Sequence, residues 1–119
     1  MRLAVILVHY HTPDLAAAAI DALRADVAGT GLEVDWLLVD NGSNAEERAK
    51  LESLPARLID PGRNLGYAGG VNLGVSETKA ELILLMNPDV LVLPGCVPAL
   101  VDRLREGASI AGPAFFWDR

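Results

Sequence analysis

Hydrophobic residues along this chain form short continuous runs, and each run ends abruptly in polar residues. Residues 3–8 form one such run, residues 34–39 form another that only Asp35 interrupts, and a third begins at residue 82 and stops at Asn87, Pro88 and Asp89. The first and third runs lack alternation of apolar and polar positions, which predicts buried strands covered on both faces, as in a parallel sheet. For the third run the strand prediction rests on its length and on Pro88, which cannot donate to a strand ladder and favours an extended Asn87.

Segments with helical spacing separate these runs. Thr12 and Pro13 predict the cap and first position of a helix whose apolar stripe continues to about Val27. Residues 43–47 offer a cap followed three positions later by glutamate, the signature of a capping box, and predict a second helix to about Leu54. The remaining predicted elements are a short strand at 57–60, helices at about 66–78 and 94–107, and a possible strand at 109–112.

The alternation of strands and helices predicts an α/β fold. Strands joined by helices of ten to fifteen residues imply right-handed crossovers and a mainly parallel sheet between two helical layers. The length of 119 residues fits one domain with a real core.

Composition narrows the possible partners. Ten basic and sixteen acidic residues give a formal net charge of −6, which argues against a nucleic-acid-binding surface. No hydrophobic run approaches the length of a membrane span, so we expect no membrane-spanning helix in this chain. We expect a cytoplasmic location, and a longer parent protein could work at the inner face of the membrane. The single cysteine, Cys96, fits a reducing compartment and a small apolar role.

Polar residues follow three of the predicted strands, at 9–11, 40–43 and 87–89. In open α/β sheets, ligands bind outside the carboxyl ends of the strands. A nucleotide needs a flat surface for its base, a carboxylate for a base N–H or ribose hydroxyl, and a cation or backbone donors for phosphate, and Tyr10, Asp40 and Arg63 could supply them. The simpler alternatives are that Asp40 and residues 87–89 form ordinary turns and that Arg63 is a solvated charge.

Glycines recur between residues 61 and 74 far more often than in an ordinary helix. Each interior glycine costs about 1 kcal/mol relative to alanine. A helix that keeps several of them needs a close approach to a strand or to a ligand.

These motifs together resemble the family 2 glycosyltransferases of the GT-A fold. The likeness rests on residues 39–43 (VDNGS), 63–74 (RNLGYAGGVNLG) and 85–89 (LMNPD), in that order, and spans the whole chain. It is strongest for the rhamnosyltransferase-like branch, which has Asn-Pro-Asp where other members have Asp-x-Asp. The resemblance implies the Rossmann-like, three-layer α/β/α donor-binding half of that fold, for which we expect a strand order of about 3-2-1-4.

The resemblance also implies roles for particular residues. Val8 and Tyr10 would line a nucleobase pocket, and Asp40 would hydrogen-bond the base. The remaining residues would lie along the donor, with Asn64 and Asn72 flanking it, Asn87 near the ribose, and Asp89 binding a metal. Mg²⁺ or Mn²⁺ suits that role, because a hard ion held by one carboxylate takes its other ligands from diphosphate and water and stabilises charge on the leaving diphosphate.

The implied reaction is an inverting transfer from a nucleoside-diphosphate sugar, such as dTDP-rhamnose or a UDP-sugar, to a hydroxyl of a polysaccharide or lipid-linked acceptor. Family members continue beyond this point with an acceptor site and a general base. We therefore expect residues 1–119 to be a donor-binding portion truncated at its C-terminus, with the base beyond Arg119 and little transfer by the chain alone. The alternative is a nucleotide-binding half-domain without catalysis. The aromatic residues at 115–117 predict exposed apolar surface near the C-terminus, which favours homo-oligomers.

Other classes fit less well. A Rossmann dehydrogenase needs Gly-x-Gly-x-x-Gly directly after the first strand, where this chain has residues 9–11, and the P-loop sequence is absent. A sugar nucleotidyltransferase would show a basic glycine-rich loop at the same place. Metal binding by His9 and His11 together is disfavoured. Alternate residues point to the same side only within a strand, and the first predicted strand ends at these residues. Asn87 stands where other family members have the first aspartate of Asp-x-Asp, and this loss of a carboxylate weakens the expected metal site.

Overall fold

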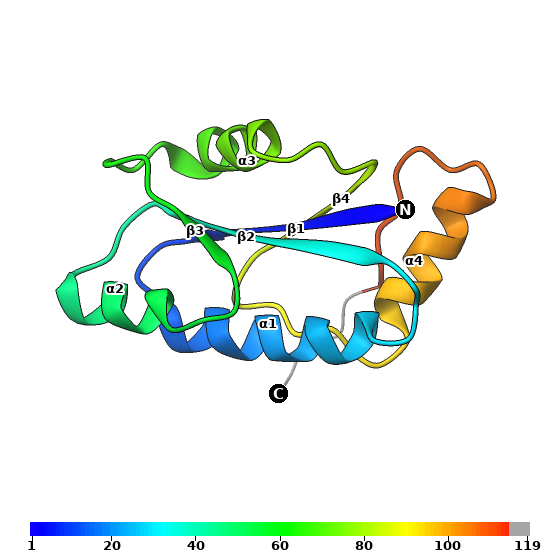
Figure 1. The fold of residues 1–119 in the computed structure, drawn as a ribbon, viewed down its shortest axis with the longest axis horizontal. Helices are drawn as coiled ribbons and strands as arrows, with labels where there is room; N and C mark the ends of the chain where they lie inside the picture. The colour runs from blue at the N-terminus through cyan, green and yellow to red at the C-terminus, as the bar shows by residue number, and fades with distance from the viewer. Residues whose placement is uncertain (115–119) are drawn as a thin grey trace.

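Within residues 1–114, which the computed structural model describes, parallel strands form one sheet in the order β3-β2-β1-β4 (Figure 1). The strands are β1 (Arg2–His9), β2 (Glu33–Asp40), β3 (Arg57–Ile59) and β4 (Leu82–Met86). All three neighbouring pairs are parallel. Parallel neighbours need a crossover connection, and a helix supplies one after each of the first three strands. The predicted fold class and strand order are confirmed.

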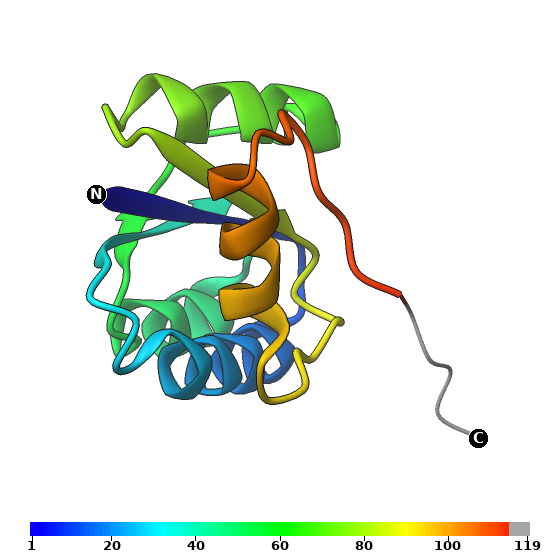
Figure 2. The ribbon, with the colours of Figure 1, turned by 90° about the vertical axis from the view of Figure 1, so that its right-hand side faces the viewer.

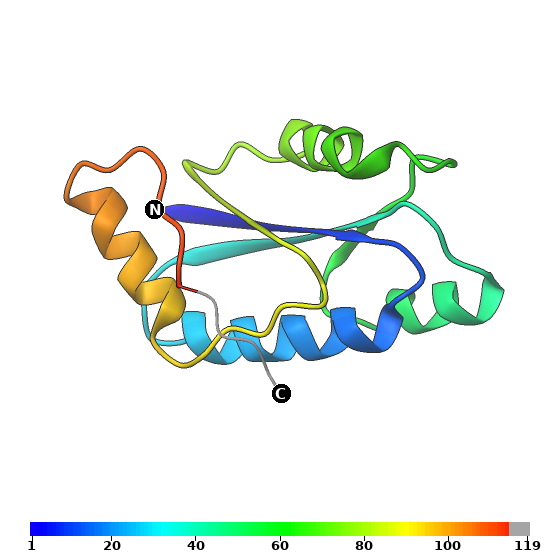
Figure 3. The ribbon, with the colours of Figure 1, turned by 180° about the vertical axis from the view of Figure 1, so that it is seen from behind.

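Helices cover the sheet on both faces. The helices are α1 (Pro13–Val27), α2 (Ala45–Glu52), α3 (Gly66–Ser76) and α4 (Cys96–Arg105). α3 lies alone on one face, over β1 and β2, while α1 and α2 lie on the other face, as the front and rear views show (Figures 1 and 3). α4 packs against α1 near the amino end of β1 (Figure 2). The capping box predicted for α2 is present, with Asn44 and Glu47 exchanging hydrogen bonds.

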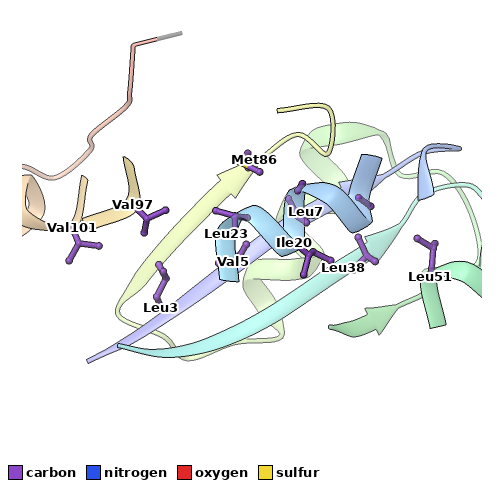
Figure 4. Packing of buried hydrophobic residues seen from close by; sticks show 12 residues of the cluster. Leu3, Val5, Leu7, Ile20, Leu23, Leu38, Leu51, Met86, Val97 and Val101 are labelled. Carbon is purple, nitrogen blue, oxygen red and sulfur yellow. The ribbon is translucent and has the colours of Figure 1, made fainter. Parts of the chain in front are cut away.

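The main hydrophobic core lies between the sheet and α1 (Figure 4). Leu3, Val5 and Leu7 of β1 point into this core, where they meet Ile20 and Leu23 of α1. Burying each such side chain fully contributes about 1.5–3 kcal/mol. The intervening β1 residues face α3 and belong to a smaller second cluster. Residues on both sides of β1 are therefore buried, as the continuous apolar run predicted.

The same prediction is wrong for β4. Ile83 is 37% exposed and Leu85 is 44% exposed. The register places them beside Ala4 and Ile6, on the face that carries α3. Because β4 is an edge strand and α3 lies over β1 and β2, this face of β4 stays open.

Other local predictions need smaller corrections. Residues 109–112 form no strand. The side chain of Thr12 makes no capping hydrogen bond, although Pro13 does begin α1. α4 begins at Cys96 rather than at Pro94. The aromatic residues at 115–117 lie outside the described residues. None of the helices described in residues 1–114 is long and apolar enough to cross a membrane.

Candidate functional site

The carboxyl ends of the strands bring the predicted polar groups to one edge of the sheet. His9, the last residue of β1, pairs with Asp40, the last residue of β2. Met86, the last residue of β4, pairs with Leu7, which precedes His9 by two residues on β1. The chain therefore leaves β4 toward Asp89 at the edge where β1 and β2 end. α3 also begins at this edge, on the left of Figure 1. The ends of β1 and β2, the turn that carries Asp89 and the start of α3 therefore share one edge of the sheet, which we call the rim.

The Asp40 carboxylate is the most heavily bonded group of this rim. It is only 5% exposed. Its Oδ1 accepts hydrogen bonds from His9 Nδ1 (3.2 Å) and from the Gly42 backbone N–H (3.1 Å). Its Oδ2 accepts from Ser43 Oγ (2.5 Å) and, at 3.5 Å, from Arg48 Nη1. A carboxylate offers about four acceptor positions, so a base N–H that reaches Asp40 would replace the long contact to Arg48.

Arg48 was not predicted as part of the site. Besides Asp40, it contacts Asp60 Oδ2 at 2.6 Å just beyond the end of β3. This hydrogen bond, together with the Gly62 N–H, lowers the pKa of Asp60. Arg48 therefore ties the ends of β2 and β3 together. The sequence gives little sign of this, because Arg48 lies in the middle of a charged helix surface.

The loops after β1 and β2 are bonded to each other. His11 adopts a left-handed backbone conformation (φ 54°), and its N–H donates to the Gly42 carbonyl at 3.0 Å. Its ring Nδ1 lies 2.7 Å from Glu47 Oε1, which also accepts the Asn44 N–H. The Asn44 hydrogen bond and then His11 lower the pKa of Glu47. The loop after β1 is thus held by the capping box of α2.

Tyr10 lies over this pair of loops and is 57% exposed. A Cβ atom at Gly42 would be 2.8 Å from two atoms of the Tyr10 ring, so the ring rests directly on the glycine backbone. The Tyr10 ring also meets the His11 ring edge-on, with centroids 4.5 Å apart. An exposed aromatic ring in this position offers the flat surface that a nucleobase needs.

The glycine-rich helix α3 approaches the rim closely. A Cβ atom at Gly70 would lie 2.9 Å from Val8 Cγ1 and 3.0 Å from Asn41 Nδ2. Asn41, which was also not predicted, accepts the Leu65 N–H (3.3 Å) and donates to the Gly66 carbonyl (2.8 Å). It is 5% exposed and fixes the start of α3 against the end of β2. The close approach expected from the glycines is confirmed for Gly70, which packs on a strand.

The other predicted residues are exposed, and Asn72 among them lies in the middle of α3 rather than at its start. Asn64 Oδ1 accepts the Gly66 N–H at 2.8 Å and so shapes the turn before α3. The remaining predicted residues are all exposed, namely Arg63, Asn72, Asn87 and Asp89. Among residues 1–114, the side chains of these four residues form no hydrogen bond or ion pair. They are the predicted groups that are free to meet a ligand.

The rim does not form a metal site by itself. Residues 1–114 contain no group of three or more His, Cys, Asp or Glu side chains placed to hold one ion. His9 is fully buried and faces Asp40, while His11 faces Glu47, so the two histidines do not converge. Asp89 fits a divalent ion only as a single ligand whose other ligands come from a bound molecule and water.

One hollow lies away from this rim. Its volume is about 440 Å³, and it lies beside the amino half of β2 and the segment that leads into β3. Its lining includes Trp36, Pro55, Arg57 and Glu77. None of the predicted site residues lines it.

The sequence and the fold were compared with known proteins. The family model for glycosyl transferase family 2 matches residues 4–118. An uncharacterized protein of Mycobacterium tuberculosis, Rv1525, is 40% identical over 98 residues, which cover 79% of this chain and 35% of that protein. The low-salt glycan biosynthesis hexosyltransferase Agl10 of Haloferax volcanii is 32% identical over 74% of this chain and 28% of its own length. The chain therefore spans about a third of the length of the curated relatives it matches.

Solved structures share the fold. The mannosyltransferase PcManGT from Pyrobaculum calidifontis, solved in complex with GDP-Man and Mn²⁺, matches with a TM-score of 0.72 at 20% identity. The match covers 86% of this chain and 32% of that one. TarS from S. aureus matches with a TM-score of 0.71 at 20% identity over 89% of this chain and 20% of that chain. At this identity the matches establish the arrangement of strands and helices.

Proposed function

Because the chain belongs to glycosyl transferase family 2, we propose that it binds a nucleoside-diphosphate sugar at the carboxyl edge of its sheet. In this proposal a longer protein transfers the sugar with inversion to an acceptor hydroxyl. The observation that carries the proposal is the meeting of three polar strand ends and the start of the glycine-rich α3 on one rim.

The base would occupy the side of the rim formed by β1 and β2. Tyr10 supplies an exposed ring beside the loop that follows Asp40, and Val8 lies beneath the start of α3. Asp40 would accept a base N–H through Oδ2, where its present contact to Arg48 is long. The simpler alternative is that Asp40 only shapes a turn. It accounts for the contacts of Asp40 to Gly42 and Ser43 but not for the burial of Asp40 beside His9.

The rest of the donor would extend from α3 toward β4. Arg63 would meet the diphosphate, Asn64 and Asn72 would flank the donor, and Asn87 would lie near the ribose. All four are exposed at or near this edge. The N-terminal end of α3 adds partial positive charge, although Asn64 already accepts the Gly66 N–H there.

Asp89 would hold a divalent ion, Mg²⁺ or Mn²⁺, together with the diphosphate. The ion would supply positive charge against the negative charge that develops on the leaving diphosphate. The protein contributes one carboxylate, exposed and without a partner among residues 1–114, so the ion would bind tightly only with the nucleotide present.

From the Asn-Pro-Asp sequence at 87–89, we propose that the chain belongs to the rhamnosyltransferase-like branch. We propose dTDP-rhamnose or a UDP-sugar as the donor and a polysaccharide or lipid-linked molecule as the acceptor. We propose that residues 1–119 make up a donor-binding portion and that the general base lies outside them. Asp102 and Glu106 do not suit that role, because they lie in and just after α4, which packs near the amino end of β1. The chain alone would then bind nucleotide and transfer little or no sugar.

The open face of β4 favours self-association of this chain. Ile83 and Leu85 of β4 are each more than a third exposed, and Leu91 and Leu93, in the segment after β4, are each more than half exposed. Exposed apolar side chains on an edge strand are typical of contact surfaces. Light scattering that shows a strict monomer at high protein concentration would count against this proposal.

Binding of nucleotides tests the donor site. The protein is titrated with dTDP, UDP and GDP, with and without Mn²⁺, by calorimetry and thermal unfolding. A nucleotide at about a hundred times its Kd should stabilise the fold by about 2.7 kcal/mol. Asp89→Ala should remove the dependence on Mn²⁺, while Asp21→Ala, which removes an exposed carboxylate from α1, should not. The absence of binding by every nucleotide would refute the site, and an unchanged Mn²⁺ effect in Asp89→Ala would refute the metal assignment.

A further inference from the structure

The geometry points to His9 as the residue that positions Asp40 for the nucleotide, acting as a hydrogen-bond donor in its Nδ1–H form. This inference rests on the proposed donor site. It adds a role for a side chain that lines no exposed surface, since His9 is 0% exposed.

The tautomer of His9 follows from its two contacts. The backbone N–H of Thr12 donates to His9 Nε2 at 2.9 Å. A backbone N–H can only donate, so Nε2 must be the unprotonated, accepting nitrogen. The ring proton therefore sits on Nδ1, which lies 3.2 Å from Asp40 Oδ1 and donates to it. Both nitrogens are used, and the ring cannot flip without losing both bonds.

This arrangement orients the carboxyl group of Asp40. In the Nδ1–H form with Nε2 accepting, the imidazole adds no positive charge beside Asp40, which meets a donor group of the ligand as a hydrogen-bond acceptor. His9 and the Gly42 N–H both bond to Oδ1, and they leave Oδ2 facing Ser43 and the long Arg48 contact. The ring thus determines which carboxylate oxygen is available.

His9 also connects separate parts of the rim. It is the last residue of β1, its Nε2 accepts from the residue before α1, and its Nδ1 reaches the end of β2. A side chain that only filled space here would need neither nitrogen. Asp40 is 31 residues away in sequence, so this contact exists only in the folded chain.

Two substitutions separate the contacts. The amide nitrogen of asparagine lies at the same distance along the side chain as Nδ1, so His9→Asn keeps a donor for Asp40 and loses the acceptor for Thr12. The amide of glutamine reaches the position of Nε2, so His9→Gln keeps a partner for Thr12 and loses the donor for Asp40. Both variants are checked for folding by circular dichroism and thermal unfolding.

Nucleotide affinity is then measured by calorimetry with the nucleotide that the wild-type protein binds best among dTDP, UDP and GDP. We expect His9→Asn to stay within about threefold of wild type and His9→Gln to lose at least about tenfold, the range for a lost hydrogen bond to a charged group. Long-range ¹H–¹⁵N NMR spectra of the wild-type protein at neutral pH should show His9 protonated at Nδ1 only.

The outcomes separate this inference from the proposed function. If the wild-type protein binds nucleotide but the two variants lose affinity equally, or His9→Asn loses more, the inference is wrong and the donor site stands. Unchanged affinity in both variants, or an Nε2–H signal for His9, overturns it in the same way. If the wild-type protein binds none of the nucleotides, the proposed function and this inference fail together.

Discussion

Replacing Gly74 by alanine tests how tightly α3 packs on the sheet. Gly74 is buried and has no left-handed backbone conformation, so alanine meets no backbone strain there. Its new Cβ, however, would lie 2.6 Å from Cγ2 of Ile6, about 1 Å closer than the 3.5–4.0 Å optimum for two carbon atoms. Ile6 is 1% exposed and β-branched, so its side chain has little room and few rotamers with which to yield.

Two effects of opposite sign decide the size of the change. Alanine in place of glycine in a helix interior gains about 1 kcal/mol of helix stability. Overpacking a close-packed core costs about 1–3 kcal/mol. At 2.6 Å from a stiff side chain, we expect the cost to lie at the upper end, so Gly74→Ala should lower the free energy of unfolding by about 1–2 kcal/mol.

Urea unfolding, followed by circular dichroism, measures this free energy. Ala68→Gly in the exposed first part of the same helix serves as the reference for helix propensity in α3. The double variant Ile6→Ala with Gly74→Ala should be more stable than the sum of the single changes predicts by at least about 1 kcal/mol, because the added methyl then fills vacated space. A Gly74→Ala protein as stable as wild type, or more stable, would show that α3 does not lie this close to β1.

Other predictions concern the ends of the helices and the charged rim. Asp26 accepts hydrogen bonds at 2.6 and 2.7 Å from two backbone N–H groups at the start of α4. Asp26→Asn should therefore cost about 1–2 kcal/mol of unfolding free energy in urea, and the exposed Asp21→Asn on the same helix close to none. Burial of the Cys96 thiol, and to a lesser extent the charge of Asp26, raises the pKa of that thiol. Its alkylation by iodoacetamide at pH 7.5 should therefore be slower than that of glutathione. Labelling at an equal or faster rate would contradict the burial of Cys96. Arg48 lowers the pKa of Asp60, so the stability that this carboxylate contributes is complete above its unfolded pKa of about 3.9 and is lost as the pH falls through the lower folded value. The difference in unfolding free energy between wild type and Asp60→Asn should be less than about 1 kcal/mol, because the pair is exposed. This difference should shrink as the pH falls from 5 to 2. A difference that grows would contradict a lowered pKa of Asp60.

The strands and the edge that carries the site follow from local patterns, whereas the strand order was expected from the family resemblance. Continuous apolar runs, each followed by polar residues, mark strands of a parallel sheet, and the carboxyl ends of parallel strands meet at one edge. The capping box of α2 is equally local, because Asn44 and Glu47 are three residues apart. The recurring glycines predicted a close approach, and Gly70 and Gly74 make it against Val8 and Ile6. These features could be predicted because the apolar runs, the capping residues and the glycine spacing that indicate them each lie within a short stretch of the chain.

The hydrogen-bond partners of each side chain at the rim could not be predicted from local patterns. Asp40 was predicted to hydrogen-bond a nucleobase or to form an ordinary turn, and in the structure His9, Gly42, Ser43 and Arg48 all contact its carboxylate. The contact to His9 depends on the register that pairs the last residue of β1 with the last residue of β2. No local pattern fixes that register to a single residue.

The amino-acid sequence by itself determined the alternating elements, the glycine-rich helix and the polar strand ends that gather at one edge. Only the tertiary structure decided which of those groups have no partner among residues 1–114, as is the case for Asp89, and which are bound within the protein, as Asp40 is. It also decided that one face of β4 stays open, since an apolar run looks the same whether or not a helix covers it. The physical reason is that hydrogen-bond partners and coverage come from segments distant in sequence, whereas periodicity and capping depend on adjacent residues.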